Sequence, residues 1–123
     1  MANYGKELLL DIHHCDPSTF TRKSIRGYLK ELCNLINMKR ESLHWWDDYG
    51  VPPEERETEP HLVGTTAVQF IKTSNIVIHT LELLSKVYIN VFSCKDFNRT
   101  DVIKFSTNWF KGKAVHVVVI ERM

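Results

Sequence analysis

The sequence has few cysteines, no long apolar run and almost no net charge. Its three cysteines, Cys15, Cys33 and Cys94, include no Cys-x-x-Cys pair, so neither a disulfide framework nor a zinc knuckle is expected. No apolar stretch approaches the roughly 18 residues that a membrane-spanning helix needs. Sixteen basic and fifteen acidic residues leave a formal charge of +1. Without a basic excess or a basic run, nucleic-acid and membrane-surface binding are not expected.

The first residues also lack the basic and then apolar pattern of a signal peptide. Together with the unpaired thiols, this favours a reducing, cytoplasmic setting. The length of 123 residues suits one domain, spanning 1–123, and 43% hydrophobic with 25% charged residues is the balance of an ordinary globular protein.

The apolar pattern predicts two helices and six strands. From about residue 18 to 37, apolar residues recur at spacings of three and four, which is typical of an amphipathic helix. A second helix is expected to start at Asn98 or Thr100 and to end at Gly112. Short runs rich in β-branched, aromatic and other apolar residues predict strands over the ranges 7–13, 38–46, 66–72, 75–81, 86–93 and 114–120.

This order predicts an α+β fold, a two-layer α/β sandwich with a mainly antiparallel sheet and two helices packed on one face. Such a sheet leaves its other face uncovered, and a second copy of the chain would cover it, so we expect a homodimer. The three tryptophans, Trp45, Trp46 and Trp109, are expected in the core or at the dimer face.

Residues 47–64 contain three prolines and four glutamates. Prolines interrupt helices and strands, and the acidic run favours solvent, so this segment predicts a loop. It is long enough to act as a lid or a partner-binding insertion, and an ordinary solvated loop is the alternative.

Three residues with chemical potential follow in the second half. Ser74 lies in the stretch Thr-Ser-Asn-Ile-Val-Ile-His-Thr, His79 follows five residues later, and Cys94 ends the stretch Val-Phe-Ser-Cys fifteen residues after that. Taken singly, a serine at a turn, a histidine on a strand and a buried cysteine are each more often structural. Only their combination points to chemistry.

This combination resembles the prokaryotic S-adenosylmethionine decarboxylases, which carry Glu-Ser-His-x-x-x-His-Thr and then Val-Phe-Thr-Cys, with the cysteine fifteen residues after the second histidine. The opening Leu-Leu-Leu-Asp-Ile-His-His-Cys-Asp-Pro is similar to the family's first strand and turn. Thr66, eight residues before Ser74, stands where the family has a serine or threonine. The resemblance covers most of the chain except the loop 47–64, which is longer than the family's usual connection.

The resemblance implies a pyruvoyl-dependent carboxy-lyase that makes the aminopropyl donor for spermidine synthesis. In such an enzyme an electrophilic carbonyl forms a Schiff base with the substrate amine and takes up the electrons left by carbon dioxide. The chain would make this pyruvoyl group from Ser74, whose hydroxyl attacks the carbonyl carbon of Thr73. Elimination of the resulting ester and hydrolysis of the dehydroalanine then cut the zymogen autocatalytically between residues 73 and 74.

The resemblance also implies the roles of the other residues. His79 would be the base that removes the Ser74 α-proton, Thr66 would hold the cyclic intermediate by a hydrogen bond, and Cys94 would return a proton to the substrate carbon. An offset of five residues places Ser74 and His79 on opposite faces of an ideal strand. The scheme therefore requires Ser74 to lie at a bend.

The sequence departs from the family in ways that leave the substrate open. Thr73 and Asn75 stand where the family has glutamate and histidine, and Leu83 replaces the glutamate expected to hold the ribose of S-adenosylmethionine. Glu82 is a substitute candidate for substrate binding, although a shift of one residue on a strand reverses the side chain. An arginine or ornithine decarboxylase, or an unprocessed binding homologue, remains an alternative.

A metal site is not expected. His13 and His14 are the obvious candidates, but adjacent residues of a strand point to opposite faces.

Overall fold

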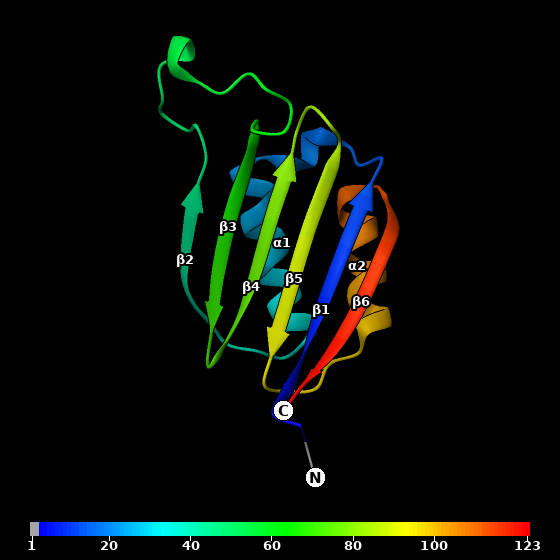
Figure 1. Ribbon diagram of the computed structural model, residues 1–123. Helices are drawn as coiled ribbons and strands as arrows, with labels where there is room; N and C mark the ends of the chain where they lie inside the picture. Colours follow the sequence, from blue (N-terminus) through cyan, green and yellow to red (C-terminus); the bar gives the residue numbers. More distant parts are fainter. Residues whose placement is uncertain (1–2) are drawn as a thin grey trace.

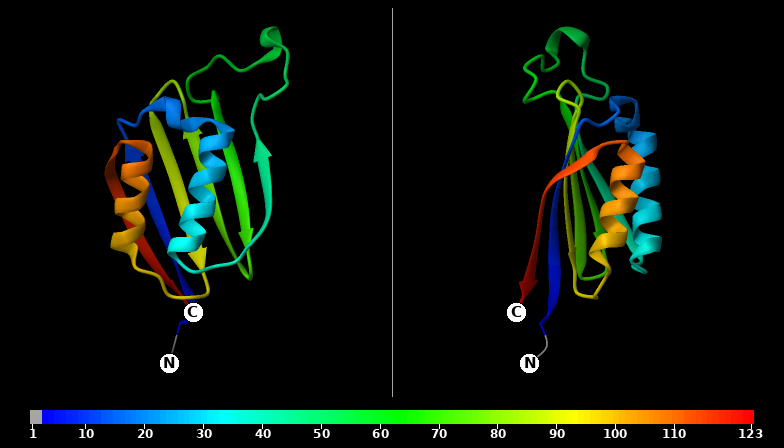
Figure 2. Two further views of the ribbon diagram at one scale, coloured as in Figure 1. Left: turned by 180° about the vertical axis from the view of Figure 1, so that it is seen from behind. Right: turned by 90° about the vertical axis from the view of Figure 1, so that its right-hand side faces the viewer.

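The computed structural model describes residues 3–123 and consists of a six-stranded sheet with two helices on one face (Figures 1 and 2). Every pairing in the sheet is antiparallel, and the strand order is β2-β3-β4-β5-β1-β6. The predicted two-layer α+β sandwich is confirmed. The strands and helices have the bounds β1 (Gly5–His13), α1 (Arg22–Leu35), β2 (Arg40–Trp46), β3 (Gly64–Ile71), β4 (Ser74–Leu81), β5 (Lys86–Ser93), α2 (Arg99–Phe110) and β6 (Lys113–Arg122).

Alternation of buried and half-buried residues in the central strands separates the two faces of the sheet. On β4 the side chains of Ser74, Ile76, Ile78 and Thr80 are buried toward the helices, while the residues between them point to the other face. Strands β3 and β5 alternate in the same way. The hydrophobic core therefore lies between the sheet and the helices, and the opposite face carries no helix or strand of residues 3–123 (Figure 2).

The two helices meet through aromatic residues and one buried hydrogen bond. Tyr28 of α1 packs against Phe105, Trp109 and Phe110 of α2. Its hydroxyl lies 2.6 Å from the Ser106 hydroxyl, so both buried oxygens are satisfied. These contacts fix how the two helices lie against each other on the covered face of the sheet.

Two boundaries differ from the sequence-based expectation. The helix predicted from residue 18 starts at Arg22, because the Thr21 hydroxyl accepts a hydrogen bond from the Ser24 N–H, and a separate 3₁₀ turn, η1 (Pro17–Phe20), precedes it. At the end of α2 the left-handed residue is Lys111, with φ 55°, and not Gly112. Gly112 serves close packing, since a Cβ there would lie 2.7 Å from the Cys15 sulfur.

The tryptophans divide between the two faces. Trp45 and Trp109 are partly buried against the core, and the Trp109 indole N–H donates to the Ser24 hydroxyl at 3.0 Å. Trp46 follows Trp45 on β2, so it points to the uncovered face, where 61% of it is exposed.

The loop 47–64 extends beyond one end of the sheet and contains one short 3₁₀ turn, η2 (Pro53–Glu55) (Figure 1). Its first residue is anchored to α1, because the Arg22 guanidinium donates two hydrogen bonds to the Asp47 carboxylate at 2.8 and 2.7 Å. The guanidinium also stacks on Tyr49 at 4.3 Å. The loop therefore has a defined attachment at its base. Within residues 3–123, no helix is long and apolar enough to span a membrane.

Candidate active site

The hairpin between β3 and β4 contains the Thr73–Ser74 peptide bond, at which the sequence analysis predicts cleavage. Ile71 pairs with Ser74, so Lys72 and Thr73 form a two-residue loop. Thr73 has φ 57°, in the left-handed region. A β-branched residue rarely adopts this conformation, which costs an L-residue about 1–2 kcal/mol. The backbone immediately before Ser74 is therefore strained.

Ser74 is the first residue of β4, and its buried hydroxyl oxygen accepts a hydrogen bond from the Cys94 N–H at 2.9 Å. This contact follows from the register of β4 and β5, in which Asn75 pairs with Phe92. The chain just after β5 consequently lies beside the β3–β4 hairpin. Ser74 pairs with Ile71 and keeps the alternation of β4, so the bend that the cleavage scheme required at this residue is not found; the turn lies before it, at Lys72 and Thr73.

Cys94 completes this group. Its sulfur lies 3.1 Å from the Thr73 hydroxyl oxygen. Hydrogen bonds, first from Thr73 and then from Ser74, hold the pKa of the Cys94 thiol below its usual value. In contrast, burial raises the pKa of Cys15 and of Cys33 to about 11. Cys94 is thus the cysteine best suited to proton transfer near neutral pH.

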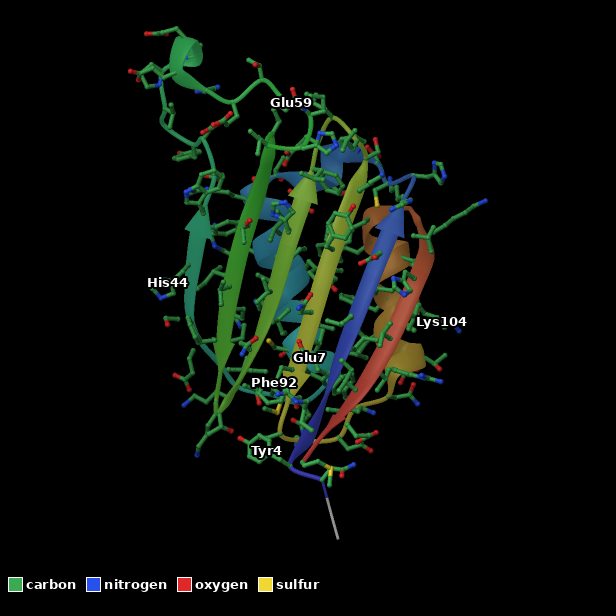
Figure 3. The ribbon with its side chains drawn as sticks, viewed as in Figure 1. Tyr4, Glu7, His44, Glu59, Phe92 and Lys104 are labelled. Carbon is green, nitrogen blue, oxygen red and sulfur yellow. The ribbon has the colours of Figure 1, made fainter. Side chains whose placement is uncertain are left out.

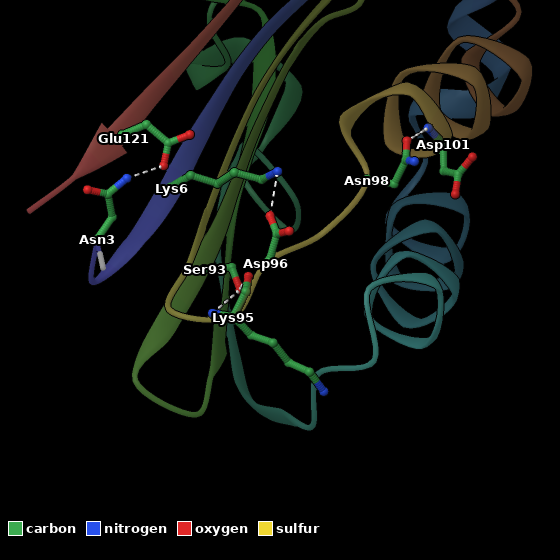
Figure 4. A network of polar contacts seen from close by, with 8 residues as sticks. All are labelled: Asn3, Lys6, Ser93, Lys95, Asp96, Asn98, Asp101 and Glu121. Carbon is green, nitrogen blue, oxygen red and sulfur yellow. Dashed lines mark hydrogen bonds and ion pairs between the residues drawn. The ribbon is translucent and has the colours of Figure 1, made fainter. Parts of the chain in front are cut away.

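Polar contacts hold the chain that follows Cys94 in place (Figure 4). The Ser93 hydroxyl donates to the Lys95 carbonyl oxygen at 2.7 Å and accepts from the Lys95 N–H at 3.0 Å. The ammonium of Lys6 on β1 lies 2.8 Å from the Asp96 carboxylate. These contacts on both sides of Cys94 keep its N–H aligned with Ser74.

His79 and Thr66 form a second group on the uncovered face. The Thr66 hydroxyl oxygen lies 2.6 Å from His79 Nδ1 across the β3–β4 pair, and the imidazole stacks on Tyr88 of β5. His79 lies five residues along β4 from Ser74, a span of about 17 Å. Their side chains also point to opposite faces. The structure therefore joins Thr66 with His79, and Thr73 and Ser74 with Cys94, but within one chain it keeps the two groups apart.

Glu82 lies just beyond the end of β4 opposite to Ser74. Burial raises the pKa of its carboxyl, which accepts a hydrogen bond from the Thr80 hydroxyl at 2.9 Å. It lines a cavity of about 450 Å³ together with Arg22, Asp47 and other residues of the α1 start and the loop 47–64. Leu83, at the position of the family's glutamate, is 59% exposed. In one chain, neither residue reaches Ser74.

The model of the family described as S-adenosylmethionine decarboxylase matches residues 6–123. The chain belongs to the S-adenosylmethionine decarboxylase family. Among solved structures, the chain is similar to the crystal structure of the adenosylmethionine decarboxylase from Aquifex aeolicus VF5, with a TM-score of 0.77 and 21% identity over 99% of this chain and 92% of that one. At that identity the likeness shows the fold alone. No curated protein matches the chain.

The S-adenosylmethionine decarboxylase family is generally pyruvoyl-dependent, and the residues around Ser74 fit the formation of that group. Ser74 follows a strained residue, its hydroxyl oxygen accepts a hydrogen bond from the Cys94 N–H, and the Cys94 thiol contacts the Thr73 hydroxyl. Among residues 3–123, no group of three or more histidine, cysteine or acidic side chains is arranged to hold a metal ion.

One residue that contacts Thr73 was missed by the sequence analysis. The Tyr4 hydroxyl donates a hydrogen bond to the Thr73 carbonyl oxygen at 3.3 Å. Figure 3 shows Tyr4 and Phe92 at the end of the sheet where β5 finishes. The contact depends on the pairing of β1 with β5, so no local sequence pattern near Tyr4 could have indicated it.

Proposed function

We propose that this protein is a self-processing, pyruvoyl-dependent S-adenosylmethionine decarboxylase in which Ser74 is the precursor of the pyruvoyl group. The observation that carries the proposal is the strained Thr73–Ser74 junction, where Cys94 contacts both residues: its N–H donates to the Ser74 hydroxyl oxygen and its thiol contacts the Thr73 hydroxyl. Its product would be the aminopropyl donor for spermidine synthesis. The chain would act as one domain in the cytoplasm, on a small amino-acid-type substrate.

Processing starts when Ser74 Oγ attacks the carbonyl carbon of Thr73. The Thr73–Ser74 C–N bond breaks, the nitrogen takes a proton, and an ester joins Thr73 to the serine oxygen. The Thr73 strain supports this step, because cleaving the peptide bond releases the residue from its left-handed conformation. A base then removes the Ser74 α-proton, and the ester leaves as the Thr73 carboxylate. Water hydrolyses the remaining dehydroalanine, releasing ammonia and leaving a pyruvoyl group.

In turnover the pyruvoyl group supplies an electrophilic carbonyl that takes up the electrons left by carbon dioxide. Cys94 then acts as the acid that protonates the substrate carbon. Its position supports this role, since the hydrogen bond from its own N–H to Ser74 Oγ keeps the residue within reach of position 74. Its lowered pKa favours rapid exchange of the proton near neutral pH.

A homodimer would bring the His79 of one protomer close to the Ser74 of the other, although the two residues lie apart within one chain. The uncovered face is rich in apolar and aromatic residues, including Trp46 and Phe70, and would be buried by a second copy. Val77 lies midway between Asn75 and His79 on that face. Two protomers could pack with their uncovered faces toward each other, related by a two-fold axis that lies between the faces, runs perpendicular to the strands and passes over Val77. This symmetry would set the His79 of one protomer over the Asn75 of the other.

In that arrangement the processing base acts in trans. The Ser74 side chain points to the helices, whereas the next residue, Asn75, faces the side where the second protomer would lie, so the partner's His79 would approach position 74 from the uncovered face. In the tautomer in which His79 Nδ1–H donates to the Thr66 hydroxyl oxygen, Nε2 carries the lone pair that would take the proton. The dimer therefore supports the assignment of His79 and Thr66 to processing.

A second substrate class is favoured by one observation. No carboxylate occupies the position of the family's ribose-binding glutamate, because Leu83 is there, and Glu82 is turned into the cavity beside Arg22. This supports an arginine or ornithine decarboxylase on the same fold as the alternative.

Intact-mass spectrometry of freshly purified protein tests the proposal. We expect the 14.4 kDa chain to give fragments 1–73 and 74–123, the latter with a pyruvoyl terminus, and Ser74→Ala to stay whole. Ser85→Ala, at the β4–β5 turn, is the matched control and should be cut normally. An uncut wild-type chain would leave only a non-catalytic binding protein. Carbon dioxide release from S-adenosylmethionine, arginine and ornithine then identifies the substrate.

A further inference from the structure

We propose that Tyr4 is a catalytic residue of self-processing, whose hydroxyl stabilises the negative charge on the Thr73 carbonyl oxygen when Ser74 attacks. The inference rests on the proposed function and adds to it a group at the reacting atoms. In the scheme above Thr66 holds the cyclic intermediate and His79 removes the α-proton, but in their own chain this pair lies about 17 Å along the β3–β4 hairpin from the scissile bond. The first step therefore needs a donor close to Thr73.

The Tyr4 hydroxyl is that donor. It contacts the Thr73 carbonyl oxygen at 3.3 Å, the atom on which charge builds as the tetrahedral intermediate forms. A phenol O–H presents one hydrogen-bond donor, and a donor aimed at this oxygen stabilises the charge that develops on it. The distance is long for an O–H···O bond, and such catalytic contacts commonly tighten as the reaction proceeds.

The fold positions Tyr4 from three directions. Its backbone N–H donates to the Arg122 carbonyl oxygen of β6 at 2.8 Å, and its ring packs against Phe92 with centroids 6.1 Å apart. Gly5 brings the start of β1 close to the end of β5, since a Cβ there would collide with the Ser93 carbonyl oxygen and lie 2.7 Å from the Cys94 Cα. Only glycine permits this approach, which carries Tyr4 to the hairpin.

Two further observations favour a chemical role over a packing role. The Tyr4 residue is half exposed, so its hydroxyl is not needed as a hydrogen-bond partner for a buried polar group. The hydroxyl also lies close enough to Cys94 to contribute, after Thr73 and Ser74, to the lowered pKa of the thiol. Tyr4 thus reaches both groups that flank Ser74, and it lines a cavity of about 290 Å³ with Cys94, Gly5 and Lys6.

The test isolates ester formation. Hydroxylamine cleaves esters but not peptide bonds, so in a His79→Ala background, where elimination is blocked, the cutting rate in excess hydroxylamine reports the attack by Ser74. We expect Tyr4→Phe to lower that rate about 10-fold or more, as loss of one oxyanion donor does in other enzymes. Tyr4→Phe keeps the ring on Phe92, and Tyr49→Phe, a 76% exposed tyrosine of the loop, is the matched control.

The outcomes separate the two proposals. Equal rates for Tyr4→Phe and its parent, both in hydroxylamine and in the otherwise wild-type chain, would overturn the role of Tyr4 while leaving self-cleavage intact. A wild-type chain that is never cut would remove the proposed function itself. A slowed Tyr4→Phe whose circular dichroism and thermal unfolding match the parent supports the inference; a parallel loss of fold in Tyr4→Phe would assign the residue to structure and overturn it.

Discussion

The Thr73 hydroxyl oxygen lies 3.1 Å from the Cys94 sulfur, and these two residues enclose Ser74. Thr73 precedes the serine and provides the carbonyl that it would attack, whereas Cys94 donates its N–H to the serine oxygen. The serine proposed for self-cleavage and the cysteine proposed for turnover therefore meet at one place, where the β3–β4 hairpin lies beside the end of β5.

Relief of the Thr73 strain should slow self-cleavage. Glycine adopts a positive φ at no steric cost, so Thr73→Gly lowers the free energy of the uncut chain by about 1–2 kcal/mol, or a factor of about 5–30 in rate. The rate constant of cutting, followed by gel or mass spectrometry, measures the effect. Ser85→Gly relieves a similar φ of 54° at the other hairpin and should leave cutting unchanged. Thr73→Ser is the control, because it keeps both the strain and the hydroxyl. If the Thr73→Gly chain were cut as fast as the Thr73→Ser chain, the strain would have no role.

Processing in trans predicts complementation between two inactive variants. Ser74→Ala has no serine to convert, and His79→Ala lacks the base, so each should remain uncut when expressed alone. Co-expressed in mixed dimers, the His79→Ala chain should be cut by the His79 of its Ser74→Ala partner. Mass spectrometry identifies the fragment by its alanine at position 79. Rapid cutting of His79→Ala alone, without hydroxylamine, would remove His79 from the scheme.

Cys94→Ala should separate processing from turnover. Ser74 attacks without help from the thiol, so we expect cutting to proceed at least in part, whereas carbon dioxide release should fall because the proton donor is missing. Cys33→Ala, which removes a buried thiol of α1, is the matched control. Its rate of turnover per folded molecule should be unchanged. Unchanged turnover in Cys94→Ala would show that another group protonates the substrate.

The lowered pKa of Cys94 should appear in its reaction with iodoacetamide. The thiolate is the nucleophile, so in the uncut Ser74→Ala chain at pH 8 we expect Cys94 to be alkylated first, because Cys15 and Cys33 have pKa values of about 11. The hydrogen bond from Thr73 is the largest cause of the lowered pKa and is retained in the Ser74→Ala chain, so it should keep the midpoint of the pH–rate curve below that of an ordinary cysteine. Adding Thr73→Val should move this midpoint to higher pH, and an unmoved midpoint would contradict the assignment.

The buried Tyr28–Ser106 contact should matter for stability. Tyr28→Phe leaves the Ser106 hydroxyl buried without its partner, which costs about 1–3 kcal/mol of unfolding free energy. Denaturant unfolding of the uncut Ser74→Ala chain, at one protein concentration, measures this loss. Adding Ser106→Ala should cost less than the sum of the two single changes. Tyr49→Phe should stay within about 0.5 kcal/mol of the parent, and an equally small effect of Tyr28→Phe would show that water replaces the contact.

Local pattern was sufficient for most of the secondary structure. The two-residue alternation of β4 and the three-and-four spacing of α1 are properties of short segments, and each survives in the folded chain because it matches the geometry of one element. The offset of five between Ser74 and His79 also predicted opposite faces correctly. The errors were at ends, where Thr21 rather than a residue near Ser18 caps α1, because side-chain capping bonds decide where a helix starts.

The sequence by itself therefore determined the elements, the covered face of each strand and the residues able to do chemistry. Only the tertiary structure decided which of them meet. The β4–β5 register brings Cys94 to Ser74, and the β1–β5 pairing brings Tyr4 to Thr73, across 20 and 69 residues of chain. Such contacts depend on pairing between distant strands, and the energy that selects a register is distributed over the whole buried face and is absent from any single segment.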